Sequence, residues 1–133
     1  MTQSMAPFLT FNGQAAEAMA FYTEALPDAV VTMQVPYPSA EGESTSDLIM
    51  YGAMTVKGSE LKFLDMDPAH PAPAFAWSTS LYVACDDEAE FDAMFAALSA
   101  EGSVMMGPES VGQIRKCAWV VDRYGVVWQP VWE

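Results

Sequence analysis

Apolar and polar residues follow two spacings along this chain, and the order of these spacings occurs twice. The apolar run Phe8–Phe11 leads through Asn12-Gly13 into an alanine-rich stretch with helical spacing, and Leu81–Ala84 later leads through Cys85-Asp86-Asp87 into a second one. At an offset of 73 positions the identities in the two helical stretches include Ala16 with Ala89, Glu17 with Glu90 and Ala20 with Ala93. Strand-like segments follow each helical stretch. The pattern therefore predicts two strand–helix–strands units.

The first helix is expected from about Gln14 to Leu26. Its apolar side chains form one stripe, which consists of Ala15, Ala18, Met19, Tyr22 and Leu26. Asn12 is the expected N-cap, because its side chain accepts a hydrogen bond from a backbone N–H that the first turn leaves unpaired. Pro27 then ends the helix, since proline has no N–H to donate.

The second helix is expected from about Glu88 to Ala100. Its apolar stripe consists of Phe91, Met94, Phe95 and Leu98. Asp87 followed by Glu90 resembles a capping box, which holds the first turn of a helix. Gly102 is expected to take the left-handed conformation that often follows the last turn. Both stripes indicate helices that pack one face against a core.

Segments rich in β-branched, methionine or aromatic residues predict the strands. These segments are Ala29–Val35, Leu48–Val56, Leu61–Met66, Ser103–Met106, Gln113–Val121 and Val126–Trp132. Hairpin turns are expected at Lys57-Gly58-Ser59 and at Asp122-Arg123-Tyr124-Gly125. Loops are expected over Pro36–Ser46 and Pro68–Pro73, and the second of these separates the two units.

This order of elements predicts an α+β fold in which the helices lie outside a curved mixed sheet. We expect a single domain over residues 1–133. Its first module covers about residues 5–67, its linker about residues 68–75 and its second module about residues 76–133. The inner face of the sheet is then free to line a cavity for a small molecule.

The acidic balance of the chain limits its partners. Its 133 residues include 18 acidic and five basic ones, which gives a formal net charge of −13. Nucleic acids and anionic membranes are bound through Lys and Arg, so neither is an expected partner. No apolar run is long enough to span a bilayer. The sequence indicates neither a signal peptide nor a disulfide framework, and we expect a cytoplasmic protein.

Two segments resemble a known superfamily. Residues Pro7–Tyr22 resemble the opening of PhnB-like proteins of the vicinal oxygen chelate superfamily, which includes glyoxalase I, extradiol dioxygenases and bleomycin resistance proteins. Residues Cys117–Gln129 are similar to the matching C-terminal hairpin, with its Asp-x-x-Gly-x-x-Trp-Gln pattern. The resemblance implies two βαβββ modules whose strands curl around a cup-shaped site, usually within a homodimer. Proteins with this pattern are often described as demethylubiquinone methyltransferase-like.

The resemblance also implies where a metal would be held, because metal-dependent members bind one divalent ion through His, Glu or Gln on four strands. The corresponding positions here are Pro7, Asp65, Ser80 and Gln129. Pro7 has no side-chain donor and Ser80 offers only a neutral oxygen, whereas a divalent site needs three or four good donors. We therefore expect no metal and no other cofactor, with Zn, Ni, Mn or Fe as the alternative.

Strand neighbours alternate between the two faces of a sheet, so these positions also predict the lining of the cup. The candidate ligand-binding residues are Leu9, Phe11, Phe63, Asp65, Ser80, Tyr82, Val127 and Gln129. Strands of the second module are further expected to carry Trp77, Trp119, Trp128 and Trp132. An aromatic lining with few polar groups is typical of a small-molecule pocket. The same side chains can instead fill the cup or a dimer interface.

The remaining reactive residues form no recognisable catalytic motif. His70 is the only histidine and lies in the proline-rich loop, where we expect it in solvent. Cys85 and Cys117 have no histidine at a recognisable spacing and are expected to pack as small apolar side chains. The sequence contains no Ser-centred elbow, P-loop or dinucleotide fingerprint. The missing Gly-rich turn also argues against a methyltransferase with a Rossmann-type cofactor site.

These observations predict a metal-independent module that binds an apolar or aromatic small molecule, for sequestration or sensing. We expect Gln129 to orient a neutral polar group of that ligand, because an amide both donates and accepts hydrogen bonds. The alternative is a metal-dependent enzyme of the glyoxalase or dioxygenase type that acts in the same cup.

Overall fold

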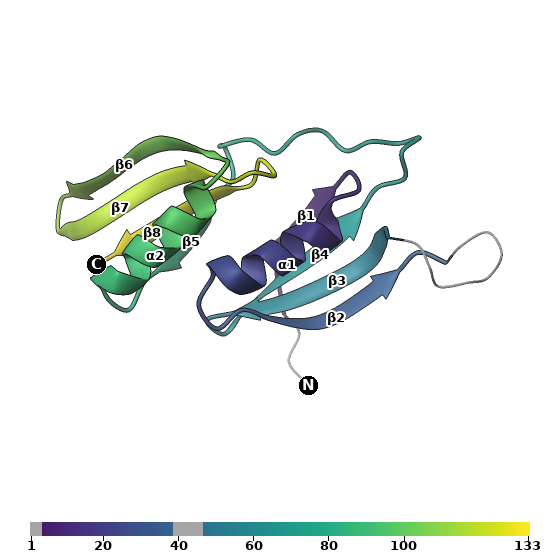
Figure 1. Ribbon diagram of the computed structural model, residues 1–133, viewed down its shortest axis with the longest axis horizontal. Helices are drawn as coiled ribbons and strands as arrows, with labels where there is room; N and C mark the ends of the chain where they lie inside the picture. Colours follow the sequence, from purple (N-terminus) through teal and green to yellow (C-terminus); the bar gives the residue numbers. More distant parts are fainter. Residues whose placement is uncertain (1–3, 39–46) are drawn as a thin grey trace. The chain divides into compact units, whose positions relative to one another are not determined.

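The computed structural model describes residues 4–38 and 47–133 and contains two compact units. The first unit is Met1–Pro73 and the second is Ala74–Glu133. Each unit packs one helix against one face of a four-stranded sheet (Figure 1). The boundary between the units falls inside the expected linker. Of the loop expected over residues 36–46, residues 39–46 lie outside the described part of the chain.

The first unit consists of a strand, a helix and a three-stranded meander. Its elements are β1 (Phe8–Phe11), α1 (Ala15–Ala25), β2 (Val30–Pro36), β3 (Ile49–Val56) and β4 (Ser59–Asp65). The strand order in the sheet is β1-β4-β3-β2. β1 runs parallel to β4, and the other neighbouring strands are antiparallel. The sheet is mixed because α1 carries the chain back between β1 and the meander.

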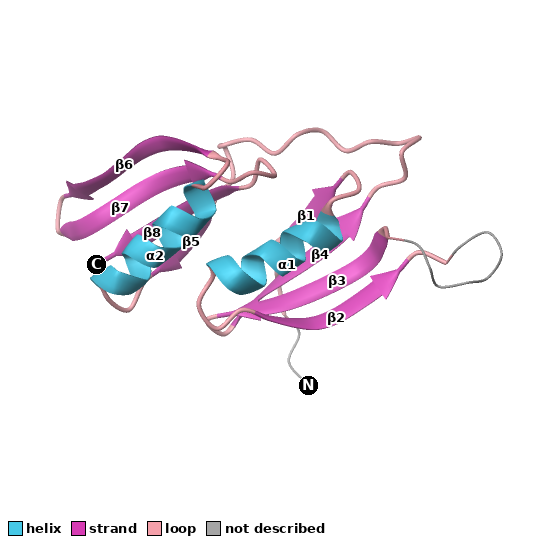
Figure 2. Ribbon diagram, in the orientation of Figure 1, coloured by secondary structure: helices cyan, strands magenta, loops and turns pink. Residues whose placement is uncertain are grey.

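The second unit repeats this arrangement. Its elements are β5 (Leu81–Ala84), α2 (Glu88–Ser99), β6 (Ser103–Val111), β7 (Ile114–Val121) and β8 (Val127–Trp132). The strand order is β5-β8-β7-β6, with β5 parallel to β8. Figure 2 shows the same element types in the same order in both units. The predicted α+β class with two βαβββ modules is confirmed, and each module has its own open sheet.

The predicted strand bounds fail clearly at one element, β6. This strand was expected to end at Met106 but continues to Val111. Gly107 and Pro108 lie inside it, and the register with β7 shifts on both sides of them. Proline cannot donate to a ladder and so marks a strand end in the sequence. β6 tolerates it because it is the edge strand of its sheet.

The start of α1 differs from the prediction. Gln14 occupies the N-cap position without a side-chain cap, so the expected role of Asn12 is wrong. Asp65 at the end of β4 supplies the missing acceptor, because its Oδ1 accepts from Gly13 N at 2.8 Å and Ala15 N at 3.0 Å. The Asn12 side chain instead donates to Ala72 O at 2.9 Å and accepts from Ala72 N at 2.8 Å.

The two ends of α2 give one confirmed prediction and one wrong one. At the N-terminus Asp87 is the N-cap as predicted, because its Oδ1 accepts from Glu90 N at 2.8 Å. Glu90 Oε1 accepts from Asp86 N at 3.2 Å, one residue before the N–H that a strict capping box would use. At the other end Glu101, with φ 61°, takes the left-handed conformation expected of Gly102. Gly102 is needed for space, since a Cβ there would lie 2.2 Å from the Val121 carbonyl oxygen.

The first sheet has one face covered by α1 and one open face. A Cβ on Gly52 would meet the Met19 sulfur of α1 at 2.8 Å, so Gly52 faces the helix. Phe63 is paired with Gly52 and shares that face, with its ring 6.1 Å from the ring of Tyr22. Phe63 and Tyr22 are both fully buried. Side chains alternate along a strand, so Lys62 lies on the open face.

The second sheet is divided in the same way. Lys116 of β7 reaches α2, where its Nζ donates to Glu88 Oε2 at 2.9 Å and to Asp92 Oδ1 at 2.8 Å. Val120 shares the parity of Lys116, pairs with Trp128 of β8, and is buried together with it. These side chains lie beneath α2. The odd-numbered residues of β7 and β8 therefore occupy the open face.

Candidate functional site

A row of polar and aromatic side chains crosses the open face of the second sheet. Gln129 lies at its centre on β8 and is paired in register with Tyr82 of β5. On the other side, the pairs Cys117 with Val131 and Val120 with Trp128 place Trp119 of β7 opposite Gln129. Val127 and Val131 lie on the same face and are buried. The structure thus brings together the residues that the sequence predicted for this module.

Gln129 and Ser80 form a neutral hydrogen-bonded pair. Gln129 Nε2 donates to Ser80 Oγ at 2.6 Å, and Ser80 directly precedes β5. Within the described residues, no protein group donates to Gln129 Oε1. A carbonyl oxygen at the middle of a sheet face is an acceptor for a ligand donor. The pair therefore orients an amide toward the open face.

Tyr82 borders this pair on the side of β5. Its side chain is 54% exposed, and its hydroxyl donates to Glu133 Oε2 at 2.8 Å. This hydrogen bond, followed by partial burial, raises the pKa of Tyr82 above the usual tyrosine value. Tyr82 therefore stays neutral at physiological pH and offers its ring to a ligand.

Trp119 borders the pair on the side of β7. Its indole Nε1 is buried and has no acceptor among the described residues. The Trp77 ring stands edge-on to it, with centroids 5.8 Å apart and an interplanar angle of 72°. Trp77 is 59% exposed and lies in the turn before β5, so its predicted place on a strand is wrong. A buried donor without an acceptor is costly.

The residues predicted to line the cup from the first module lie on the wrong face. Leu9 and Phe11 of β1 and Phe63 and Asp65 of β4 are all buried on the face that α1 covers. The expectation that they face the open side was wrong because a shift of one residue moves every side chain of a strand to the opposite face.

The hydrogen bonds of Asp65 give this residue a structural role. Its side chain is 0% exposed. Besides the two N–H groups at the start of α1, Ile49 N donates to its Oδ2 at 2.9 Å. Three backbone donors from two distant segments therefore share one buried carboxylate. Asp65 fastens the end of β4 to the starts of α1 and β3.

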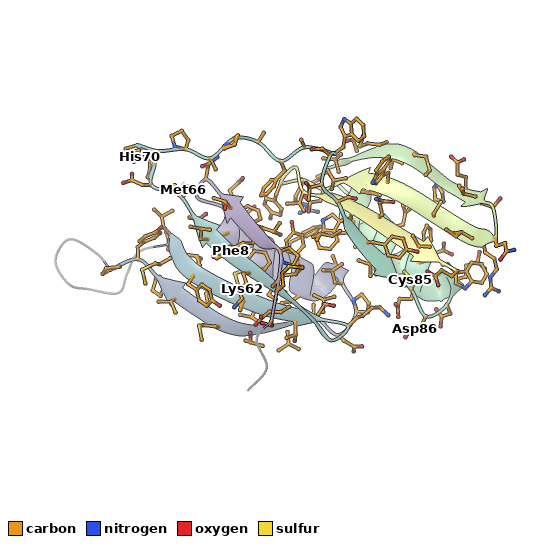
Figure 3. All side chains as sticks on the ribbon, turned by 180° about the vertical axis from the view of Figure 1, so that it is seen from behind. Phe8, Lys62, Met66, His70, Cys85 and Asp86 are labelled. Atoms are coloured by element: carbon orange, nitrogen blue, oxygen red, sulfur yellow. The ribbon has the colours of Figure 1, made fainter. Side chains whose placement is uncertain are left out.

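Lys62 of β4, which was not among the predicted site residues, lies on the open face of the first sheet. It is paired with Phe8 of β1, and Figure 3 labels the side chains of Lys62 and Phe8 on this sheet. Gln129 is paired with Tyr82 in the same way in the second sheet. Its Nζ donates to the Tyr51 hydroxyl and lies 3.5 Å from Glu60 Oε1. The hydrogen bond to Tyr51, with a further contribution from Glu60, raises the pKa of Lys62. A lysine inside the apolar strand of residues 61–66 was the signal that could have identified this position.

Two comparisons with known proteins bear on this geometry. The family described as 3-demethylubiquinone-9 3-methyltransferase matches residues 3–131. The chain belongs to this family. A solved structure from Bacillus cereus, described as a putative 3-demethylubiquinone-9 3-methyltransferase and PhnB protein, is 30% identical with a TM-score of 0.86, and the match covers 98% of this chain and 100% of that one. A Pseudomonas aeruginosa protein is 28% identical with a TM-score of 0.86, covering 99% and 98% of the two chains.

More distant structures show the fold of the superfamily. A glyoxylase/bleomycin resistance protein/dioxygenase domain from Frankia is 11% identical with a TM-score of 0.69, covering 99% of this chain and 92% of that one. The predicted PhnB-like assignment is confirmed, and the fold is that of a glyoxylase/bleomycin resistance protein/dioxygenase domain. No curated protein matches the chain. Among the described residues, no helix is both long and apolar enough to cross a membrane.

The residues of this family member do not fit a divalent metal. Of the four positions that correspond to ligands, Pro7 has no donor, and the Asp65 carboxylate is buried among backbone N–H groups. On the open face of β4 the structure places the ammonium of Lys62. Within residues 4–38 and 47–133, no three His, Cys, Asp or Glu side chains lie close enough together to hold an ion. An ammonium and a neutral amide lack the donor set of a divalent site.

The remaining reactive side chains are an exposed histidine and two buried thiols. His70 is exposed in the loop after β4, where its backbone N–H donates to Asp67 O at 2.8 Å (Figure 3). Cys85 and Cys117 are buried free thiols. Burial, together with the charge of Glu109, raises the pKa of Cys117. A thiol with a raised pKa is a weak nucleophile at neutral pH.

Proposed function

We propose that this protein binds a small uncharged aromatic molecule on the open face of its second sheet, without a metal. The observation that carries the proposal is the pair of Gln129 and Ser80 at 2.6 Å, with Tyr82 and Trp119 on either side of it. Aromatic walls with a few fixed polar groups are the usual composition of a ligand site.

The polar atoms of this face define what the ligand must offer. Gln129 Oε1 accepts a hydrogen bond, and the buried Trp119 Nε1 donates one. A molecule with an aromatic ring and a neutral carbonyl or amide group satisfies both atoms. Its ring gains further contact with Tyr82, whose ring is largely exposed. Sequestration or sensing of such a molecule is the function that this chemistry supports.

The alternative is an enzyme in the same place. A glyoxalase- or dioxygenase-type reaction would need a divalent ion, and the neutral side chains of Gln129 and Ser80 do not favour one. The methyltransferase in the family's description would need a methyl donor. The connection Asn12-Gly13-Gln14 between β1 and α1 is not a Gly-rich cofactor loop. We therefore favour binding over catalysis.

We further propose that the protein is a homodimer in the cytoplasm. The edge strands β2 and β6 carry exposed apolar side chains, among them Val30, Met33, Val104 and Val111. Natural proteins cover such edges, and a symmetric dimer is the commonest means. Light scattering should give twice the 14.5 kDa chain mass, and a mass of 14.5 kDa at micromolar concentration would contradict the dimer.

Benzamide tests the binding proposal, because it joins a phenyl ring to a neutral amide. Titration should change the amide NMR signals of Tyr82 and Trp119 in the wild-type chain. Gln129→Ala should weaken benzamide about fivefold, which corresponds to about 1 kcal/mol for one neutral hydrogen bond. Gln113→Ala is the matched control, since it deletes an exposed amide at the β6–β7 turn.

Equal benzamide affinity in the Gln129→Ala and Gln113→Ala variants would contradict the proposal. The natural ligand can be sought by native mass spectrometry of protein taken directly from cells. A co-purified neutral aromatic compound is the expected finding. A tightly held divalent metal in stoichiometric amount would instead favour the enzyme.

A further inference from the structure

The open face of the first sheet carries Lys62, one of the few basic residues of this chain. Only five basic residues stand against 18 acidic ones. Lys116 is held by two carboxylates at 2.9 and 2.8 Å, and Arg123 is paired with Glu101 at 3.2 Å. Among the described residues Lys62 has one carboxylate neighbour, Glu60, at the longer distance of 3.5 Å. Its side chain is 26% exposed on a central strand, so this charge is held at a fixed place on the sheet.

Two hydrogen-bond donors converge at this place. The Lys62 ammonium donates to the Tyr51 oxygen, which leaves the Tyr51 hydroxyl hydrogen available. That hydrogen has no acceptor within the described part of the chain. An ammonium has three hydrogens, and Tyr51 and Glu60 are the two partners of Lys62. Lys62 and Tyr51 can therefore each donate to one of two neighbouring oxygen atoms.

Apolar side chains surround these donors on the same face. The Phe8 ring is 52% exposed and stands edge-on to the Tyr51 ring, with centroids 6.2 Å apart. Lys62 is paired with Ala53, and Ala53 with Met33, which is 49% exposed. The ring of an aromatic ligand can thus contact Phe8 while its polar end reaches Lys62.

We propose that this face is a second binding site, which takes a small aromatic carboxylate. The carboxylate oxygens accept from the Lys62 ammonium and the Tyr51 hydroxyl, and the ring lies against Phe8. The site supplies a single positive charge, which matches one carboxylate better than a doubly charged phosphate. It lies in the first unit and uses none of the residues assigned to the neutral ligand of the second.

Glu60 provides a test in which a substitution is expected to strengthen ligand binding. Its carboxylate is the present partner of Lys62, so an incoming carboxylate must replace it or share the ammonium with it. Replacing Glu60 by glutamine removes the competing charge and keeps the size of the side chain. A ligand carboxylate should then bind more tightly. A role of Lys62 confined to stability would give no such gain.

The experiment compares benzoate with benzamide by amide NMR titration of the full chain, following signals of β3 and β4. Lys62→Met should weaken benzoate at least about tenfold, and Glu60→Gln should tighten it about threefold, as expected for loss and gain of one charge-assisted contact. Lys62→Arg should retain binding. Lys57→Met, which removes the same charge at the β3–β4 turn, should leave the affinity within about twofold because salt screens a charge that does not touch the ligand.

Benzoate affinity that is unchanged in Lys62→Met, or lowered in Glu60→Gln, would overturn the proposal. So would benzamide binding to these signals as tightly as benzoate. Gln129→Ala should leave the benzoate titration of β3 and β4 unaltered. A result that contradicts the neutral-ligand site in the second unit is thereby distinguished from one that contradicts the carboxylate site in the first.

Discussion

The two units place different chemistry at the same position of the same fold. Lys62 in the first sheet and Gln129 in the second both lie on the strand that pairs in parallel with the first strand of the unit. Each faces the open side, each is opposed by an aromatic residue, and each donates to a hydroxyl, that of Tyr51 or of Ser80. One position offers an ammonium and the other a neutral amide. The repeated fold thus determines where on the sheet a ligand can bind, whereas the residue at that position determines which charge the ligand carries.

The buried carboxylates of the units differ in a second way. Asp65 accepts from backbone groups of α1 and β3 and so joins segments that are distant in the sequence. Asp122 accepts from Tyr124 N at 2.8 Å, Val126 N at 3.1 Å and Trp128 Nε1 at 2.8 Å, all in or next to its own hairpin. Asp65 therefore stabilises contacts between distant segments of the first unit. Asp122 stabilises the hairpin in which it lies.

The largest predicted effect is loss of stability in Asp65→Ala. Three backbone donors, two of them buried, would lose their acceptor, and we expect the free energy of unfolding to fall by about 3 kcal/mol. Asp67→Ala is the matched control, because Asp67 is exposed and its side chain accepts locally, from Ala69 N two residues later. Urea denaturation followed by far-ultraviolet circular dichroism measures both variants. Equal stability of the two variants would show that Asp65 does not hold the first unit together.

A second prediction concerns Gln129→Glu, which gives the second sheet a negative charge. Benzamide binding should weaken by about 1.5 kcal/mol, because a carboxylate on an aromatic face is poorly solvated and no cation lies in the row to balance it. The variant should still bind no divalent ion tightly, since the side chains beside position 129, Ser80 and Tyr82, offer only neutral hydroxyl oxygens as metal ligands. Calorimetric titration with Zn²⁺ and Ni²⁺ checks this. A tight metal site in this variant would mean that the ligand positions are misassigned.

The order of elements could be predicted because it depends on local signals. The cap of α2 needs only Asp87 and Glu90, and the Lys57-Gly58 turn has the positive φ values, 49° and 81°, that a tight hairpin requires. The open face of the second sheet was also predicted, because Gln129 and the alternation around it fix the phase of β8.

The open face of the first sheet could not be predicted. β1 has four residues with phenylalanine at both ends, so its alternation does not show which face is buried. The role of Asp65 depends on donors from residues 13, 15 and 49, which no spacing in the sequence connects to it. The importance of Lys62 likewise depends on Tyr51, which β3 brings beside it.

The smallest predicted effect concerns the pH dependence of Tyr82. Its pKa is raised by the hydrogen bond to Glu133, so the neutral phenol is favoured in the folded state. The stabilisation from this bond is complete below the pKa of an unfolded tyrosine, about 10, and is lost as the pH rises through the higher folded value. Absorbance of the phenolate band should show a late-titrating tyrosine that disappears in Tyr82→Phe. In Glu133→Gln it should titrate earlier, and no change in that variant would exclude Glu133 as the cause.

Exchanging the two central residues tests most directly whether Lys62 and Gln129 set the charge of the ligand. The variant carries Lys62→Gln together with Gln129→Lys, which keeps the composition and net charge of the chain. In the wild type, benzoate is expected to shift the amide NMR signals of β3 and β4. In the exchanged chain it should shift those of β5 and β8 around Tyr82 instead. Benzoate shifts that stay on β3 and β4 after the exchange would contradict the assignment of the anion site to Lys62.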